Sequence, residues 1–263
     1  MTGTSRQPRG VWGANRLVGN AQSVFFTDTM FFAKGENRMP IVSIVYHSLS
    51  GHTAKLAEAV ENGVASVNEV EVHRLAIIGD DIVKGRWDNP EIMAQLDVSD
   101  AIIFGAPTSM GDVSGQMKCF IDKTSEIFYP RRWADKLAAG FTSSFYPSGD
   151  KLHTLHTFVT FAMQQGMIWI GHNAARFEEV TPKIYEPASI NRLGGWMGVM
   201  ATSHPWSSPD VFPSEADLSA GRALGQRVSE AAIRWTSKEE GSVEPPSEEE
   251  GLHRSRAERG SHV

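Results

Sequence analysis

Apolar residues along this chain form short, compact runs that alternate with longer segments of helical period. The first clear run, Ile41–Tyr46, is apolar at every position except Ser43, and it lies between Pro40 and a loop of small polar residues. This pattern is typical of a strand that is buried on both faces. In the next segment, residues 52–67, the apolar positions recur at helical spacing and predict an amphipathic helix.

The same alternation continues along the chain to about residue 235. It predicts further strands at 70–75, 101–104, 139–144 and 167–170, and further helices at 114–128, 152–164 and 214–235. Strands that alternate with helices of this length form a parallel sheet covered on both faces, because right-handed crossovers place the helices there. We therefore expect an α/β, doubly wound, five-stranded parallel sheet in the flavodoxin-like order 2-1-3-4-5, with helices on both faces.

The ends of the chain differ from this central domain, which we place at residues 39–235. Residues 1–38 contain aromatic and arginine residues without a sustained period, so we treat them as an N-terminal extension of uncertain structure. Residues 236–263 are rich in Glu, Pro and Ser and almost free of apolar residues. A segment of this composition cannot bury enough surface to offset the entropy of ordering, so we expect a disordered acidic tail.

Charge and cysteine content exclude several classes of function. The formal net charge is −6, of which the tail contributes half, so neither nucleic-acid binding nor a strongly acidic docking surface is expected. No run approaches the roughly 18–20 apolar residues of a membrane helix, so we expect no membrane association. Cys119 is the single cysteine, so an internal disulfide is impossible and a cytoplasmic location is expected.

The loop after the first predicted strand combines hydroxyls, a glycine and a helix N-terminus. Its residues are Ser48, Leu49, Ser50, Gly51, His52 and Thr53. Backbone N–H groups converge in such a loop, and the helix N-terminus adds a partial positive charge, so the loop suits a phosphate group. It lacks both the lysine of an ATP-binding P-loop and the Gly-x-Gly-x-x-Gly of a dinucleotide site. From this loop alone, a monophosphate site and a simple helix cap are equally good interpretations.

A second loop, at 105–118 (GAPTSMGDVSGQMK), follows the third predicted strand. Together with the loop at 48–53, it resembles the flavodoxin-like NAD(P)H:quinone oxidoreductases of the WrbA family, named after the tryptophan-repressor-binding protein. Further matches are DAIIFG at 100–105, SGQMKCFIDKT at 114–124, QGM at 165–167 and PSE at 213–215, so the resemblance extends from about residue 41 to residue 235. Two loops and a helix motif in this order are far more specific than either loop alone.

The resemblance implies a protein that binds FMN and transfers two electrons from NADH or NADPH to a quinone or a similar small acceptor. It implies that the phosphate is held by the loop at 48–53, and that the flavin ring lies along Pro107, Thr108, Ser109, Met110 and Gly111. Both loops follow strand ends and would flank the crevice where doubly wound sheets bind ligands. The resemblance also implies a homodimer or a homotetramer. It assigns no catalytic side chain, because the flavin carries the chemistry, and we expect no metal site.

The chain departs from the family pattern at the third flavin loop. Where the family has Ser-Thr-Gly-Thr-Gly-Gly, residues 144–149 read Ser-Phe-Tyr-Pro-Ser-Gly, so the backbone path must differ. The residues that we expect beside the flavin here are Ser144, Phe145, Tyr146 and Gly149. A family histidine beside the flavin corresponds to Gln164, which cannot titrate near neutral pH. A family tryptophan that lines the acceptor pocket corresponds to Phe128, which remains apolar.

Two alternatives to this function are compatible with the sequence. One is a flavodoxin-type electron-transfer protein that docks with redox partners, although the nearly balanced charge of the domain argues against it. The other is a flavodoxin-like scaffold whose altered third loop has lost FMN. The long connection at 171–202 carries apolar residues such as Trp196 and Met197, and we expect it to support the oligomer.

Overall fold

The computed structural model describes residues 38–173, 190–204 and 206–237. The expected extension and tail therefore lie outside the described residues, except for Arg38 at one end and Thr236 and Ser237 at the other. No helix of the described part is long and apolar enough to cross a membrane.

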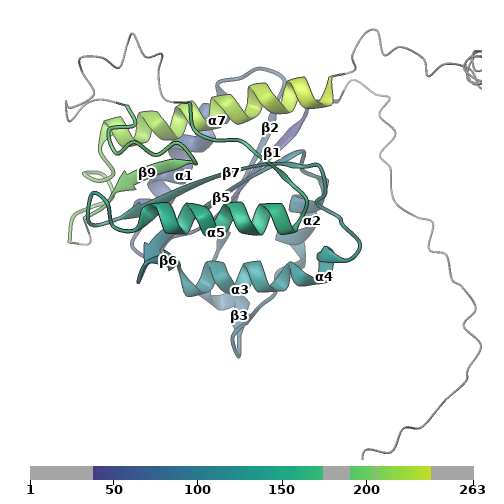
Figure 1. Cartoon of the computed structure of the whole chain (residues 1–263), viewed down its shortest axis with the longest axis horizontal. Helices are drawn as coiled ribbons and strands as arrows, with labels where there is room; N and C mark the ends of the chain where they lie inside the picture. The colour runs from purple at the N-terminus through teal and green to yellow at the C-terminus, as the bar shows by residue number, and fades with distance from the viewer. Residues whose placement is uncertain (1–37, 174–189, 205, 238–263) are drawn as a thin grey trace, which may run out of the picture. The chain divides into compact units, whose positions relative to one another are not determined.

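A mainly parallel sheet forms the centre of the domain (Figure 1). Its order is β2 (Glu71–Ile77), β1 (Ile41–His47), β5 (Ala101–Ser109), β7 (Leu137–Ser144), and then a fifth position shared by β8 (Ile168–Trp169) and β9 (Val199–Thr202). β8 pairs with the beginning of β7 and β9 pairs with its end, both in parallel. The predicted doubly wound fold and the order 2-1-3-4-5 are confirmed.

The fifth strand differs from the prediction, which placed it in one piece at 167–170. The chain leaves the sheet after Trp169 and completes the strand only with β9, which the sequence analysis assigned to a connection. Trp169 Nε1 donates to the carbonyl oxygen of Met197 at 2.8 Å, and His172 N–H donates to that of Trp196 at 2.9 Å. These bonds hold the beginning and the end of the intervening segment against each other.

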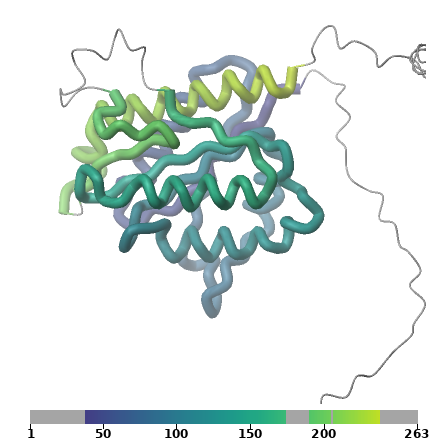
Figure 2. The backbone as a smooth tube through the Cα atoms, in the orientation of Figure 1, coloured from purple at the N-terminus to yellow at the C-terminus, as the bar shows by residue number. Residues whose placement is uncertain are grey.

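Helices cover both faces of the sheet, as Figures 1 and 2 show. One face carries α1 (His52–Ala65) and α7 (Glu215–Thr236), and the other carries α2 (Pro90–Val98), α3 (Gly115–Lys123) and α5 (Lys151–Gln164). α1 and α7 lie in direct backbone contact, because a Cβ at Gly225 would stand 2.1 Å from the Val60 carbonyl oxygen. Ser214 begins α7 as predicted, since its Oγ accepts the Asp217 N–H at 3.3 Å.

The two faces bury cores of different character. The core under α3 and α5 is rich in aromatic residues, with Phe104 stacked on Phe158 at 5.9 Å between ring centroids and Trp133 fully buried beside Phe104. The core under α1 and α7 is aliphatic apart from Tyr46 and Phe141. Sheet residues of alternate direction supply both cores, so the central strands β1 and β5 are mostly apolar.

Several elements were missed or merged in the sequence analysis. α2 begins with Asn89 as N-cap, whose Oδ1 accepts the Ile92 N–H at 3.1 Å, and with Pro90 in the first turn. A two-stranded hairpin of β3 (Ile82–Val83) and β4 (Arg86–Trp87) precedes it. The helix predicted at 114–128 is two helices, α3 and α4 (Ser125–Phe128). It is interrupted at Thr124, whose backbone carbonyl accepts from Gln165 Nε2 at 3.2 Å.

Candidate functional site

The loop between β1 and α1 curls around the side chain of Ser48. Its Oγ accepts the N–H groups of Gly51 at 3.2 Å and Ala54 at 3.1 Å. Gly51 has a φ of +88°, and a Cβ at this position would lie 2.7 Å from Pro209 Cγ. Glycine is therefore required here both by its backbone conformation and by the neighbouring loop.

The curled loop leaves hydrogen-bond donors without partners at the start of α1. Within the described residues, the N–H groups of Ser50, His52 and Thr53 form no hydrogen bond, and the first turn of α1 contains no acidic residue. Leu49 and Ser50 are exposed. Free N–H groups at a helix N-terminus attract an anion, so the loop has the properties that the sequence analysis expected of a phosphate site.

His52 joins this loop to the segment before α7. Its Nε2 lies 3.1 Å from the carbonyl oxygen of Ser207, which can only accept, so Nε2 carries a proton. In the neutral ring Nδ1 then accepts from the Ser50 hydroxyl at 2.8 Å. The side chain of His52 is therefore buried and hydrogen-bonded at both ring nitrogens, whereas its backbone N–H has no hydrogen-bond partner among the described residues. The residues around 207–209 were missed in the sequence analysis.

Hydroxyl pairs fix the carboxyl ends of the central strands to one another. Thr53 Oγ1 lies 2.9 Å from Ser143 Oγ, which joins α1 to the end of β7. Thr108 Oγ1 lies 2.9 Å from Thr142 Oγ1 and 2.8 Å from Thr154 Oγ1, which joins β5 to β7 and α5. The loops that follow these strands therefore start from a rigid base.

The second loop is a β-hairpin, which the sequence analysis did not predict. β5 continues to Ser109, which pairs with Asp112 of β6 (Asp112–Val113) in antiparallel orientation. Met110 and Gly111 form the turn with φ values of 50° and 90°, as in a two-residue hairpin of the primed type. Methionine rarely adopts a positive φ, and such strain is typical of functional positions. The Met110 side chain is fully exposed.

The third loop, at 144–149, brings aromatic rings to the same edge. Phe145 contacts Tyr146, His204 and Trp206, with ring centroids 4.8, 5.2 and 5.9 Å apart, and we call these four residues the aromatic cluster. Trp206 is 82% exposed and Tyr146 is 68% exposed. Gly149 closes the loop with a φ of 53°, and a Cβ there would lie 2.1 Å from Ser144 Oγ.

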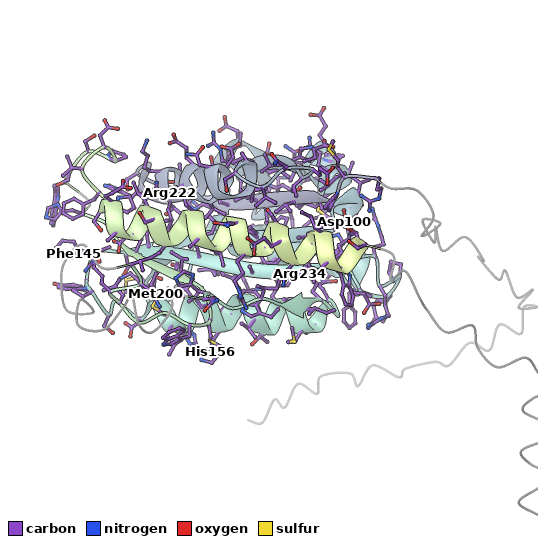
Figure 3. All side chains as sticks on the ribbon, turned by 90° about the horizontal axis from the view of Figure 1, so that it is seen from above. Asp100, Phe145, His156, Met200, Arg222 and Arg234 are labelled. Carbon is purple, nitrogen blue, oxygen red and sulfur yellow. The ribbon has the colours of Figure 1, made fainter. Side chains whose placement is uncertain are left out.

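Phe128 and Gln164 do not lie with these loops in one protomer. Gln164 ends α5, which has 14 residues and so spans about 20 Å at the usual helical rise. Phe128 ends α4, and Figure 1 shows α4 and β6 at opposite ends of the domain. Figure 3 likewise shows Phe145 at one end and Asp100, next to the start of β5, at the other. Within a single protomer, therefore, Gln164 does not lie beside the expected flavin site, and Phe128 does not lie beside it to line an acceptor pocket.

His47 was overlooked at this edge. It ends β1, is almost fully buried, and its Nδ1 lies 2.8 Å from Oγ of Ser114, the N-cap residue of α3. Burial lowers the pKa of His47, so the ring is neutral near pH 7. His47 could have been found from the sequence, because it directly precedes the phosphate-type loop at a strand end. Pro107, which was expected at the site, lies opposite Ser143 in the sheet register.

The fold and this edge together define a flavodoxin-like protein with free N–H groups at the first loop, a strained hairpin and an aromatic third loop. A family model described as NADPH-dependent FMN reductase matches residues 39–181. An NAD(P)H dehydrogenase (quinone) of Archaeoglobus fulgidus is 32% identical over 207 residues, which cover 74% of this chain and 98% of that protein. A protein of Pseudomonas aeruginosa named flavodoxin FldP is 34% identical over 187 residues, covering 71% and 93% of the two chains.

Solved structures agree with these sequence matches. The structure described as a flavodoxin, WrbA-like protein from Agrobacterium tumefaciens has a TM-score of 0.54 and 33% sequence identity, and the match covers 74% of this chain and 98% of that one. The chain belongs to the NADPH-dependent FMN reductase family. The resemblance to WrbA-like proteins that the two loops indicated is thereby confirmed.

Proposed function

We propose that this protein is an FMN-dependent oxidoreductase that transfers two electrons from NADH or NADPH to a quinone or a similar small acceptor. The observation that carries the proposal is the N-terminus of α1, where the N–H groups of Ser50, His52 and Thr53 are free of hydrogen bonds in the described part of the chain. Family membership and the quinone-reducing relatives support the same function.

The residues at the carboxyl edge fit FMN. Ser48, Leu49, Ser50, Gly51, His52 and Thr53 would hold its phosphate through backbone donors, without a lysine. The hairpin from Thr108 to Gly111 and the third loop from Ser144 to Gly149 would position its ring. When bound, FMN would supply the redox chemistry, which is to accept hydride from reduced nicotinamide and to pass electrons to the acceptor. The protein supplies orientation and fixed backbone dipoles.

The aromatic cluster gives the proposed site an exposed surface of aromatic rings. Phe145 and Tyr146 stand where the family has small residues, and Trp206 extends the same ring surface. Exposed aromatic faces bind planar ligands by stacking. We propose that this surface contributes to the choice of acceptor.

We further propose that the working form is a homodimer or a homotetramer in the cytoplasm. Phe128 lies far from the loops of its own protomer and is 39% exposed, so it can border a flavin only in another copy. Trp196, at 63% exposure, offers further apolar surface. Light scattering should give a mass of at least two chains, and a monomer at micromolar concentration would contradict this assembly.

Steady-state kinetics with NADH or NADPH and benzoquinone test the enzymatic proposal. If both substrates use one pocket in turn, double-reciprocal plots at several quinone concentrations will give parallel lines. Intersecting lines would contradict the shared pocket, and an absence of turnover with FMN bound would contradict the enzymatic function.

A second candidate is a flavodoxin-type electron-transfer protein, because one relative at 34% identity carries that name. The candidates differ in their electron donor. A protein that binds FMN but is reduced by neither NADH nor NADPH would favour the electron-transfer function. A protein that binds no FMN would instead favour the scaffold alternative.

A further inference from the structure

Lys151 is a fully buried lysine directly beneath the third loop. It is the first residue of α5, and its side chain has an exposed fraction of 0%. Its Nζ donates to the carbonyl oxygens of Tyr146 at 2.5 Å and Pro147 at 3.1 Å, and its backbone N–H donates to the carbonyl oxygen of Ser148 at 3.2 Å. One residue therefore binds three consecutive carbonyl groups of the loop.

These bonds determine which backbone groups the loop presents on its outer side. In a trans peptide the C=O and the following N–H point in opposite directions. When Lys151 draws the carbonyls of Pro147 and Ser148 inward, the N–H groups of Ser148 and Gly149 point outward. Neither N–H forms a hydrogen bond within the described residues. The loop thus offers two free donors without the glycine-rich sequence of the family.

The surroundings of Lys151 carry opposite charges. Burial lowers the pKa of Lys151 to about 8, Asp217 on α7 acts to raise it, and Arg192 acts to lower it. Asp217 is itself 3% exposed and accepts from Arg192 at 3.1 Å and from the Thr202 N–H at 2.9 Å. The other titratable side chains of the third loop and the first turn of α5 are those of Tyr146, Asp150 and His153, and all three are exposed. At pH 7 most Lys151 side chains therefore carry a positive charge beneath the loop.

We propose that Lys151 is a positioning residue for the third loop, which it shapes from below so that the N–H groups of Ser148 and Gly149 face a bound flavin. The inference rests on the proposed FMN site. Lys151 touches the loop backbone and not the cofactor, so its effect on binding is transmitted through the loop. Its positive charge adds to the attraction for an anionic ligand.

The test compares Lys151→Met with the native protein in FMN titrations followed by flavin fluorescence. Loss of the carbonyl anchor should raise the dissociation constant at pH 7 at least tenfold. The thermal midpoint of the FMN-free protein should change by only a few degrees, because removal of a buried charge offsets the loss of the two carbonyl hydrogen bonds. A residue needed only for folding would lower that midpoint and leave the affinity of the folded fraction unchanged.

Lys136 provides a matched control. It is a partly buried lysine whose pKa is likewise lowered to about 8 by burial, and its Nζ donates to the Asp97 carbonyl at 2.7 Å near the opposite edge of the sheet. Lys136→Met should leave the FMN dissociation constant within about twofold of the native value. An equal loss of affinity in both variants would overturn the positioning role of Lys151.

Titrations at different pH values add a second readout. Native affinity should fall between pH 7 and pH 9 as Lys151 loses its proton, whereas Lys151→Met should show no such fall. If Lys151→Met does not fold, Lys151→Gln, which keeps a neutral donor, should bind FMN with an affinity that lacks the pH-dependent loss. Native-like FMN affinity and pH dependence in a folded variant would overturn the proposal. Failure of the native protein to bind FMN would instead overturn the proposed function.

Discussion

Gly51 and Met110 show how single residues adapt this fold to its site. Both have positive φ values, 88° and 50°. Gly51 meets this requirement without strain, whereas Met110 does not, because its Cβ crowds the backbone in this conformation. A glycine after a strand is readable from sequence as a loop residue. A strained methionine is not, because only the paired strands on either side reveal the turn.

Replacement of Gly51 by alanine should separate the two roles of this glycine. The positive φ should cost about 1–2 kcal/mol of folding free energy, and the clash with Pro209 should displace the loop and weaken FMN binding at least tenfold. Denaturant unfolding and an FMN titration measure the two effects.

Gly85→Ala is the matched control for this variant. Gly85 also has a positive φ, 77°, but a Cβ there would have no neighbour within 4 Å. The Gly85→Ala variant should lose about as much folding free energy as Gly51→Ala does, and it should keep the native FMN affinity. If Gly51→Ala binds FMN as well as Gly85→Ala does, the phosphate-site assignment is wrong.

At the scale of elements, the alternation of strands and helices was predictable because buried strands and amphipathic helices have distinct periods. The features that the sequence analysis predicted wrongly involve contacts between residues distant in sequence. At the split in the fifth strand, Trp169 Nε1 donates to the Met197 carbonyl. At the break in the helix at 114–128, the Thr124 carbonyl accepts from Gln165 Nε2 as well as from the Ile127 N–H. Local pattern carries no information about either partner. The hairpin at 108–113 was missed because its strands are too short to show a period.

The contact between α1 and α7 yields a prediction at this scale. Gly225→Ala should destabilise the protein by about 1–3 kcal/mol through overpacking, because the new Cβ would stand 2.1 Å from the Val60 carbonyl oxygen. Gly115→Ala, at the start of α3 and with no neighbour within 4 Å of its Cβ, should be neutral or slightly stabilising. Urea unfolding of both variants measures the difference, and equal stabilities would contradict the close helix contact.

At the scale of the whole molecule, the sequence placed the three loops correctly at one edge, because carboxyl ends of parallel strands meet there. It could not place Phe128 and Gln164, because correspondence with a family position does not say which subunit's site a residue serves. It also could not foresee the support behind the loops. His52 to Ser207 and Thr53 to Ser143 join residues that are 155 and 90 positions apart.

Stability of the whole domain should depend on pH through His172. Burial and the nearby Arg227 lower the pKa of His172 to about 4, below its ordinary value of 6.5. Between these values the unfolded chain binds more protons than the folded one, so stability falls as the pH drops from 6.5 to 4, by an amount on the order of 3 kcal/mol. His172→Phe should flatten this part of the profile in urea unfolding. If the variant loses as much stability as the native protein between pH 6.5 and pH 4, groups other than His172 cause the loss.

The most direct test of the proposed function is an absorbance spectrum of the purified protein with FMN, recorded before and after anaerobic addition of NADH or NADPH. We expect a protein-bound flavin spectrum that bleaches on addition of the nicotinamide and returns when benzoquinone is added. A bound flavin that neither nicotinamide bleaches would contradict the proposed enzyme, and a spectrum of free FMN alone would contradict the site itself.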